Sequence, residues 1–424
     1  MAHCNGLILT VGMTDEGIVY SLRQLQPRFV AFLCTTTSEP TLDRVLAQFS
    51  LRPSAYRKFV VPDQASQIGR LCTEFYSAYR WLIDDCALAP ADIACDPTAG
   101  RKWMSAGETM VATLVGLRVQ YVDVDYVQGT PDPTTMRLVD MGNADDQSGF
   151  LKAGIARELF NRHEFAAAAE AFARIHPSQS AWNDLYQGLA NLSCALHRWD
   201  LFEHYDHPLR VAFTDSLNRL ERALGSAPLP PSFSEFVRSV GNLAGAIDEL
   251  THAYKPCLLA TLDLLQNANR RIKQGRFNDA MARLYRALES LSQHYLLGYG
   301  IEASSPNYGL LGTHQQEAIR KRLDGSLPKR ISLDHGWLIL WELEHPAARE
   351  LYHLDQRGRL SHRLKGVLDS RNRSIMAHGW QPVREQNIGD MWKRTLELLR
   401  KVEGKMALSQ LDRFQLLQLP SFWK

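Results

Sequence analysis

The chain has 424 residues, of which 45% are hydrophobic and 22% charged, and its formal net charge is +2. These values are ordinary for a globular protein of two or three domains. The apolar runs are far shorter than the roughly 18 residues of a membrane span, and the first residues lack the pattern of a secretory signal. The seven cysteines, an odd number, are scattered along the chain, so we expect reduced thiols in a cytoplasmic protein.

The first third alternates short apolar runs with segments of helical length. The runs 7–11 and 29–34 read as buried parallel strands, because each is largely apolar and is followed by polar residues. Such alternation predicts a doubly wound α/β domain. Further strands are predicted at 56–61, 93–95, 119–124 and 136–139, and helices at 68–85 and 105–117.

Polar residues follow three of the predicted strands. A doubly wound sheet binds its ligand at the carboxyl ends of the strands, so residues 12–14, 35–38 and 96–102 should line one crevice. The last stretch places a hydroxyl, a glycine and two cations where a strand passes into a helix, and helix starts favour phosphate. A phosphodiester fits there, but a tight turn with a solvated Arg-Lys pair would look the same. No Gly-x-Gly-x-x-Gly is present, which argues against a nicotinamide enzyme.

The stretch Asp96-Pro-Thr-Ala-Gly-Arg-Lys102 resembles the Asp-x-Thr-Gly-Gly-Thr-Lys motif of CARF domains, the sensors of cyclic oligoadenylate in type III CRISPR immunity. Ala99 and Arg101 replace a glycine and a threonine of that motif. The resemblance implies a Rossmann-like domain that binds a cyclic oligoadenylate. The expected binding residues are Gly12, Met13, Thr14, Thr35, Thr36, Thr37, Asp96, Thr98, Gly100, Arg101 and Lys102.

The middle of the chain reads as helical. Residues 155–175 look like a tetratricopeptide-type unit that turns near 161–164, and 182–196 reads as another helix. One or two such units cannot bury a face alone, so we interpret them as a connector packed on its neighbours, with peptide binding as the alternative. A boundary is predicted at 225–232, where prolines and small residues stop a helix.

Three histidines, His197, His204 and His207, lie close together after this helix. No cysteine pair or His-Glu-x-x-His pattern accompanies them. We therefore expect them to be packing residues, and we expect no metal site.

The segment 371–379 places arginine and histidine a few residues apart. RNA carries its own nucleophile, the ribose 2′-OH, so a cleaving enzyme needs to move protons, as histidine can, and to stabilise phosphate charge, as arginine can. In one regular helix, Arg371 would lie within about 20° of His378 around the axis and Arg373 about 140° away. Arg373 remains possible if the helix is irregular. An exposed helix could also carry these side chains without any function.

Arginine, a polar residue and histidine after a gap of four to six residues form the signature of HEPN ribonucleases, which Arg371, Asn372, Arg373 and His378 resemble. Residues 263–289 look like the paired helices that precede this motif in CRISPR-associated members. The resemblance implies a metal-independent ribonuclease with these four residues at its catalytic site. Residues 351–405 carry 12 Lys and Arg against 6 Asp and Glu, which fits a phosphate-bearing substrate or an ordinary solvated surface.

Together the resemblances cover nearly the whole chain and are those of a CARF–HEPN ribonuclease. The predicted fold class is α/β plus all-α: a Rossmann-like sensor at 1–147, a helical connector at 148–225 and a HEPN domain at 226–424. We expect a homodimer that cleaves single-stranded RNA to 2′,3′-cyclic phosphate ends without a cofactor, activated by cyclic tetra-adenylate or, as the alternative, hexa-adenylate. A non-catalytic sensor that regulates, dimerises or binds nucleic acid is the alternative function, and slow cleavage of the cyclic ligand is a third possibility.

Overall fold

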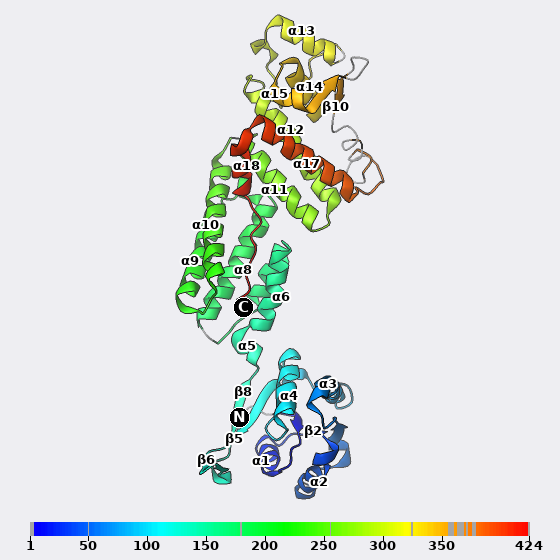
Figure 1. The fold of residues 1–424 in the computed structure, drawn as a ribbon, viewed down its shortest axis with the longest axis vertical. Helices are drawn as coiled ribbons and strands as arrows, with labels where there is room; N and C mark the ends of the chain where they lie inside the picture. The colour runs from blue at the N-terminus through cyan, green and yellow to red at the C-terminus, as the bar shows by residue number, and fades with distance from the viewer. Residues whose placement is uncertain are drawn as a thin grey trace. The chain divides into compact units, whose positions relative to one another are not determined.

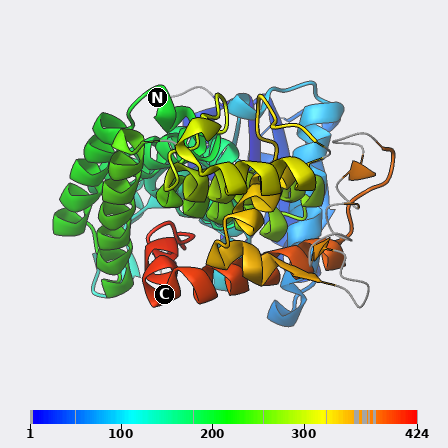
Figure 2. The ribbon, with the colours of Figure 1, turned by 90° about the horizontal axis from the view of Figure 1, so that it is seen from above.

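The computed structural model describes residues 4–49, 51–178, 180–254, 256–323, 325–354, 360–362, 369, 372–374 and 379–422. The chain forms two compact units, shown from two directions in Figures 1 and 2. Unit 1 comprises Met1–Leu151 and Ile175–Ser180, and unit 2 comprises Lys152–Arg174 and Ala181–Lys424. None of the described helices combines the length and the apolar character of a membrane span.

Unit 1 is built on a six-stranded sheet of order β3-β2-β1-β4-β5-β8 (Figure 1). The first five strands are parallel, and β8 is antiparallel to β5. No α-helix lies between β5 and β8 to cross over the sheet, so the chain returns antiparallel. The predicted Rossmann-like α/β fold is confirmed. The strands are β1 Gly6–Thr10, β2 Phe29–Cys34, β3 Tyr56–Val60, β4 Ile93–Asp96, β5 Arg118–Asp123 and β8 Arg137–Gly142, and Tyr126–Val127 pairs with Thr130–Pro131 as the hairpin of β6 and β7.

Strand β1 is buried on both faces because its side chains alternate between two hydrophobic clusters. Ile8 packs with residues of α3 and α4, whereas Leu7 and Leu9 pack with residues of α1 and α2. Helices on both sides thus hold the strand ends, and the loops that follow them, at one edge of the sheet. The helices are α1 Glu16–Leu25, α2 Glu39–Gln48, α3 Ile68–Asp84 and α4 Lys102–Leu114, followed by the short α5 Ala144–Ser148.

The described part of unit 2 is helical except for a small hairpin, β9 Tyr352–Leu354 with β10 Leu360–His362. The tetratricopeptide-like pair corresponds to α6 and α7, and the predicted pair at 263–289 corresponds to α11 and α12, which pack closely. Gly275, between α11 and α12, has a φ of +72°, which glycine adopts readily. The helices are α6 Phe150–Asn161, α7 Phe165–Ala173, α8 Ser180–Asp200, α9 Arg210–Ser226, α10 Pro231–His252, α11 Leu258–Lys273, α12 Phe277–Leu297, α13 Thr313–Arg322, α14 Leu333–Glu342, α15 Pro346–Leu351, α17 Glu385–Val402 and α18 Gly404–Asp412.

The boundary predicted at 225–232 falls on the turn between α9 and α10. These two helices pack against each other, and both belong to unit 2. The division of this part of the chain into a connector and a HEPN domain stays a prediction.

A buried polar network joins α8 to α11 within unit 2. Asp200, the last residue of α8, accepts hydrogen bonds from Arg270 Nε at 2.6 Å and from Arg271. Trp199 Nε1 donates to Asp263 Oδ1 at 2.9 Å, and the Arg270 guanidinium lies 4.0 Å from the Trp199 ring centroid. All five side chains are buried. Since a buried charge is stable only with partners of this kind, the network fixes α8 on α11.

The buried carboxyl of Asp263 makes stability depend on pH. Burial raises its pKa to about 7, against about 3.9 in an unfolded chain. Between these values the folded protein keeps a proton that the unfolded chain releases, so this group lowers stability by about 1.4 kcal/mol per unit of rising pH. Asp263→Asn keeps an oxygen acceptor for Trp199 and does not titrate. Relative to the wild type, we expect the variant to gain about 2 kcal/mol between pH 5 and pH 7 in urea unfolding; parallel pH profiles would contradict this.

Candidate functional site

The loops after β1, β2, β3 and β4 are joined by hydrogen bonds at the carboxyl edge of the sheet in unit 1. Thr37 Oγ1 donates to Asp63 Oδ2 at 2.7 Å, and Arg101 Nη1 donates to the Asp63 carbonyl at 3.1 Å. The Met13 carbonyl accepts from Thr41 Oγ1 at 3.2 Å. The structure therefore brings the three predicted stretches, 12–14, 35–38 and 96–102, to the same edge.

Two glycines let the loops after β1 and β4 interlock. A Cβ on Gly12 would lie 1.5 Å from the carbonyl oxygen of Ala99, and a Cβ on Gly100 would lie 2.7 Å from Thr10 Oγ1. Neither position has room for a side chain. Gly12 is thus required for the close approach of the two backbones, and Gly100 for the close approach of its backbone to the Thr10 side chain, at the point where the strand order reverses.

Replacing Gly12 by alanine is expected to destabilise unit 1 by about 1–3 kcal/mol, because the new methyl group forces the loop at Ala99 to move. Differential scanning calorimetry of the full chain measures this as a lower Tm. Gly69→Ala is the matched control, since a Cβ at Gly69 meets nothing within 4 Å and alanine favours the helix. Equal Tm values for Gly12→Ala and the control would contradict the interlocked geometry.

Three of the predicted hydroxyls are engaged within the protein. Thr98 Oγ1 donates to Asp96 Oδ1 and accepts from Val122 N at 2.9 Å. Thr35 Oγ1 accepts from Ser38 N at 3.3 Å and caps the short turn that follows β2, and the exposed Thr37 donates to Asp63. Because Thr98 and Thr35 shape the loops, contact with a ligand is left to the exposed members of the set. Those are Met13, Thr14, Thr36, Thr37, Arg101 and Lys102.

The floor of this edge contains two buried carboxyls. Burial raises the pKa of Asp96, and it raises the pKa of Glu108 well above the usual range, which favours their neutral forms. At the rim, Arg101 and Lys102 stand exposed at the start of α4, where helix N–H groups add positive potential. Carboxyls whose ionisation is disfavoured by burial, together with two cations at the rim, suit a phosphodiester.

Three residues at this edge were not predicted from the sequence. Glu108 lies inside α4, and its carboxyl group is fully buried. Asp63 follows β3, and hydrogen bonding from Thr37 lowers its pKa. Arg44, on α2, donates to the Met13 carbonyl at 3.2 Å. Each comes from an element whose position is set by the strand order, so no local motif signals it.

In unit 2, residues 379–381 lie beside residues 373–374. Gln381 N donates to the Arg373 carbonyl at 3.0 Å, and Gly379 N donates to the Ser374 carbonyl at 3.1 Å. In a continuous helix residues 373 and 381 would be about 12 Å apart along the axis, so these two residues do not belong to one continuous helix. A Cβ on Gly379 would lie 2.0 Å from the Arg373 carbonyl oxygen, so this close approach requires glycine.

The structure describes two of the four predicted catalytic residues. Asn372 and Arg373 are exposed, whereas Arg371 and His378 lie outside the described residues. The helical-wheel comparison of Arg371 with His378 therefore stays a prediction. The choice between Arg371 and Arg373 stays open.

The three neighbouring histidines differ in environment. His204 is fully buried, with its Nε2 3.7 Å from Asp263 Oδ2, while His197 is half-buried and His207 is exposed. Across the described residues, no group of three His, Cys, Asp or Glu side chains is arranged to hold a metal ion.

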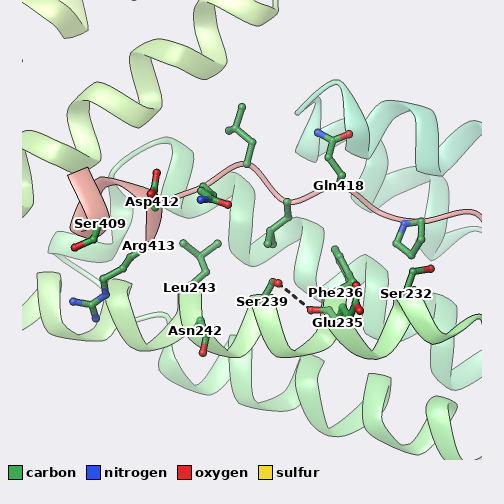
Figure 3. A pocket seen from close by; sticks show the side chains of 14 residues that line it. Ser232, Glu235, Phe236, Ser239, Asn242, Leu243, Ser409, Asp412, Arg413 and Gln418 are labelled. Atoms are coloured by element: carbon green, nitrogen blue, oxygen red, sulfur yellow. Dashed lines mark hydrogen bonds between the residues drawn. The ribbon is translucent and has the colours of Figure 1, made fainter. Parts of the chain in front are cut away.

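A groove of about 680 Å³ lies between α10 and the C-terminal segment in unit 2 (Figure 3). Its charged lining residues are Glu235, Asp412 and Arg413. Arg413 is neutralised by Glu249, whose two oxygens accept at 2.6 and 2.9 Å. With two carboxylates and one paired cation, this groove does not suit a phosphate-bearing ligand.

Known proteins are similar to the C-terminal part of this chain in sequence and to nearly the whole chain in fold. Residues 249–402 match the family model of the Csm6 HEPN domain. The chain is similar to the CRISPR system endoribonuclease Csm6 of Thermus thermophilus, with 26% identity over 347 residues that cover 76% of this chain and 71% of the relative. In fold it is similar to Enterococcus italicus Csm6 bound to cyclic hexa-2′-fluoro-hexa-dAMP, with 12% identity, a TM-score of 0.50, and coverage of 96% of this chain and 99% of that one. Can2 from Sulfobacillus thermosulfidooxidans, in complex with cyclic tetra-adenylate, aligns over 54% of this chain and 70% of its own with 12% identity, but its TM-score of 0.23 is too low to support an argument.

Proposed function

We propose that the chain is a member of the CARF–HEPN family and a CRISPR endoribonuclease that cleaves single-stranded RNA when a cyclic oligoadenylate binds unit 1. The observation that supports this most directly is the match of residues 249–402 to the Csm6 HEPN domain. The predicted catalytic segment 371–378 lies inside this range. The polar residues at the carboxyl edge of the sheet in unit 1 offer a separate place for the activator.

The cleavage step requires only groups that the motif provides. His378 takes the proton of the ribose 2′-OH, or supplies one to the leaving 5′-oxygen, while Arg371 or Arg373 stabilises the charge on the phosphate. The 2′-oxygen forms a bond to phosphorus as the bond to the 5′-oxygen breaks. The products are a 2′,3′-cyclic phosphate and a 5′-OH, with Asn372 orienting the site, and no metal ion takes part.

Activation is proposed to use the symmetry of a homodimer. A ring of identical nucleotides suits identical half-sites across a two-fold axis, and each copy offers Arg101 and Lys102 at its rim. The histidines of two HEPN halves would meet in a composite cleft. Because a ligand shifts a conformational equilibrium only by its differential affinity, the ring has to bind the active arrangement more tightly than the idle one. We expect cyclic tetra-adenylate as the activator, with hexa-adenylate as the alternative.

The test is cleavage of a fluorogenic single-stranded RNA in EDTA, without ligand and then with cyclic tri-, tetra- or hexa-adenylate. The proposal predicts cleavage that depends on one ring size and leaves 2′,3′-cyclic phosphate ends, detected by mass spectrometry. Ligand binding with no cleavage under any condition would instead support a non-catalytic sensor. Loss of intact ring from the same mixtures would reveal cleavage of the ligand itself.

A further inference from the structure

Trp380 is the most exposed large hydrophobic residue in the described part of the chain, with 88% of its surface accessible. An indole is mostly apolar, and folding normally buries much of it. Left exposed, such a side chain is suited to contact a partner. The other described tryptophans are all buried or half-buried: Trp81, Trp103, Trp182, Trp199, Trp337, Trp341 and Trp392.

The backbone around Trp380 is held on both sides. Each of its two neighbours donates a backbone hydrogen bond to the segment 373–374, at 3.1 and 3.0 Å. Further along, Val383 N donates to Asn278 Oδ1 of α12 at 3.2 Å. The indole therefore projects from a backbone that is held in place, and an aromatic side chain has only two χ angles to fix when it makes a contact.

A cation stands at the same fold-back. Arg373 is exposed, and its carbonyl accepts a hydrogen bond from the backbone N–H of Gln381, the residue after Trp380. Its guanidinium forms no ion pair with the residues that the structure describes. Trp380 also follows His378 by two residues, which span at most about 7 Å of chain. Proteins hold single-stranded RNA with this combination, in which cations contact the phosphates and aromatic rings stack on the bases.

We infer that Trp380 stacks on a base of the single-stranded RNA substrate close to the phosphate that is cleaved. The inference rests on the proposed ribonuclease function and identifies a residue that positions the substrate. Because every base has a π face, this contact supplies affinity with little sequence preference. Proton transfer is still assigned to His378, and stabilisation of the phosphate charge to Arg371 or Arg373.

The test measures RNA binding separately from cleavage. A fluorescein-labelled, 2′-O-methylated single-stranded RNA lacks the nucleophile, so its anisotropy reports Kd alone. The variants are Trp380→Ala, Trp380→Phe as the conservative change, and Tyr254→Ala as a matched control, since Tyr254 is an exposed aromatic residue on another loop of unit 2. A parallel series of RNAs carries a single abasic site at successive positions.

Trp380→Ala is expected to raise Kd about 5- to 100-fold, while Trp380→Phe and the control stay close to the wild type. The loss should be similar at low and high salt, because stacking neutralises no phosphate. One abasic position should weaken binding by the wild type and not by Trp380→Ala. A Kd for Trp380→Ala within twofold of the wild type would overturn the inference. It would also be overturned if sedimentation showed a dimer for the wild type and monomers for Trp380→Ala, because the partner of Trp380 would then be a second copy of the chain. If RNA binding depends on Trp380 but the wild type cleaves nothing, the ribonuclease proposal fails and the stacking contact stands.

Discussion

Replacing His378 by alanine is expected to lower RNA cleavage by a factor of about 10² to 10⁴, because the 2′-OH and the 5′-oxygen lose their proton-transfer partner. Affinity for the cyclic ligand should not change, since the ligand is proposed to bind in unit 1. The measurement is the ligand-activated rate on fluorogenic RNA, with isothermal titration of the ligand on the same preparations.

His314→Ala provides the control for this substitution. His314 is an exposed histidine of unit 2, on α13, and it has no proposed part in the reaction. Its rate should stay within about twofold of the wild type. Undiminished cleavage by a pure preparation of His378→Ala would remove His378 from the catalytic site.

Asp200→Ala is expected to destabilise unit 2 by about 3–5 kcal/mol, because it leaves the buried Arg270 and Arg271 without their shared carboxylate. Urea unfolding of the full chain measures this as a lower transition midpoint. Loss of the Asp200 carboxylate should also weaken the attachment of α8 to α11, which is the first helix of the pair predicted at 263–289.

Asp184→Ala is the matched control for Asp200→Ala. Asp184 also lies between two arginines, with Arg219 and Arg222 each 3.2 Å away, but these side chains are partly exposed to solvent. Pairs of this kind contribute about 1 kcal/mol or less. Equal losses from the two variants would show that burial does not set the strength of the network.

The centre of the sheet in unit 1 could be predicted closely because β1, β2 and β4 are buried on both faces. The predicted strand 29–34 coincides with β2, and 7–11 is displaced by one residue from β1. Helices α3 and α4 were likewise expected near their observed positions. Runs that are apolar on both faces have few alternative arrangements in water, so the sequence constrains them strongly.

The surroundings of the expected binding residues at the carboxyl edge of the sheet could be predicted only in part. Glu108 reads as an ordinary polar residue of a helix, and its burial follows from the packing of α4 on the sheet. Asp63 and Arg44 reach the crevice from β3 and α2, whose positions depend on the strand order. Thr98 was expected to face a ligand, but its hydroxyl is held by Asp96 and Val122. Spacing along the chain does not contain this information.

Spacing along the chain does not show where a helix ends, so the angles expected between the predicted catalytic residues could not be established from the sequence. Such angles apply only while the helix continues, and the hydrogen bond between Gln381 N and the Arg373 carbonyl excludes one continuous helix from residue 373 to residue 381. Gly379 was the local signal, because its missing side chain permits the close approach to Arg373.

The measurement that tests the account most directly compares two curves for the cyclic ligand. One is the RNA cleavage rate of the wild type against ligand concentration, and the other is binding of the same ligand to His378→Ala by isothermal titration. We predict no cleavage without ligand and a half-maximal rate at a concentration that matches the binding Kd. Full cleavage without ligand would contradict the claim that one chain couples sensing to RNA cleavage. So would a cleavage rate that does not change with ligand concentration over the range in which ligand binding saturates.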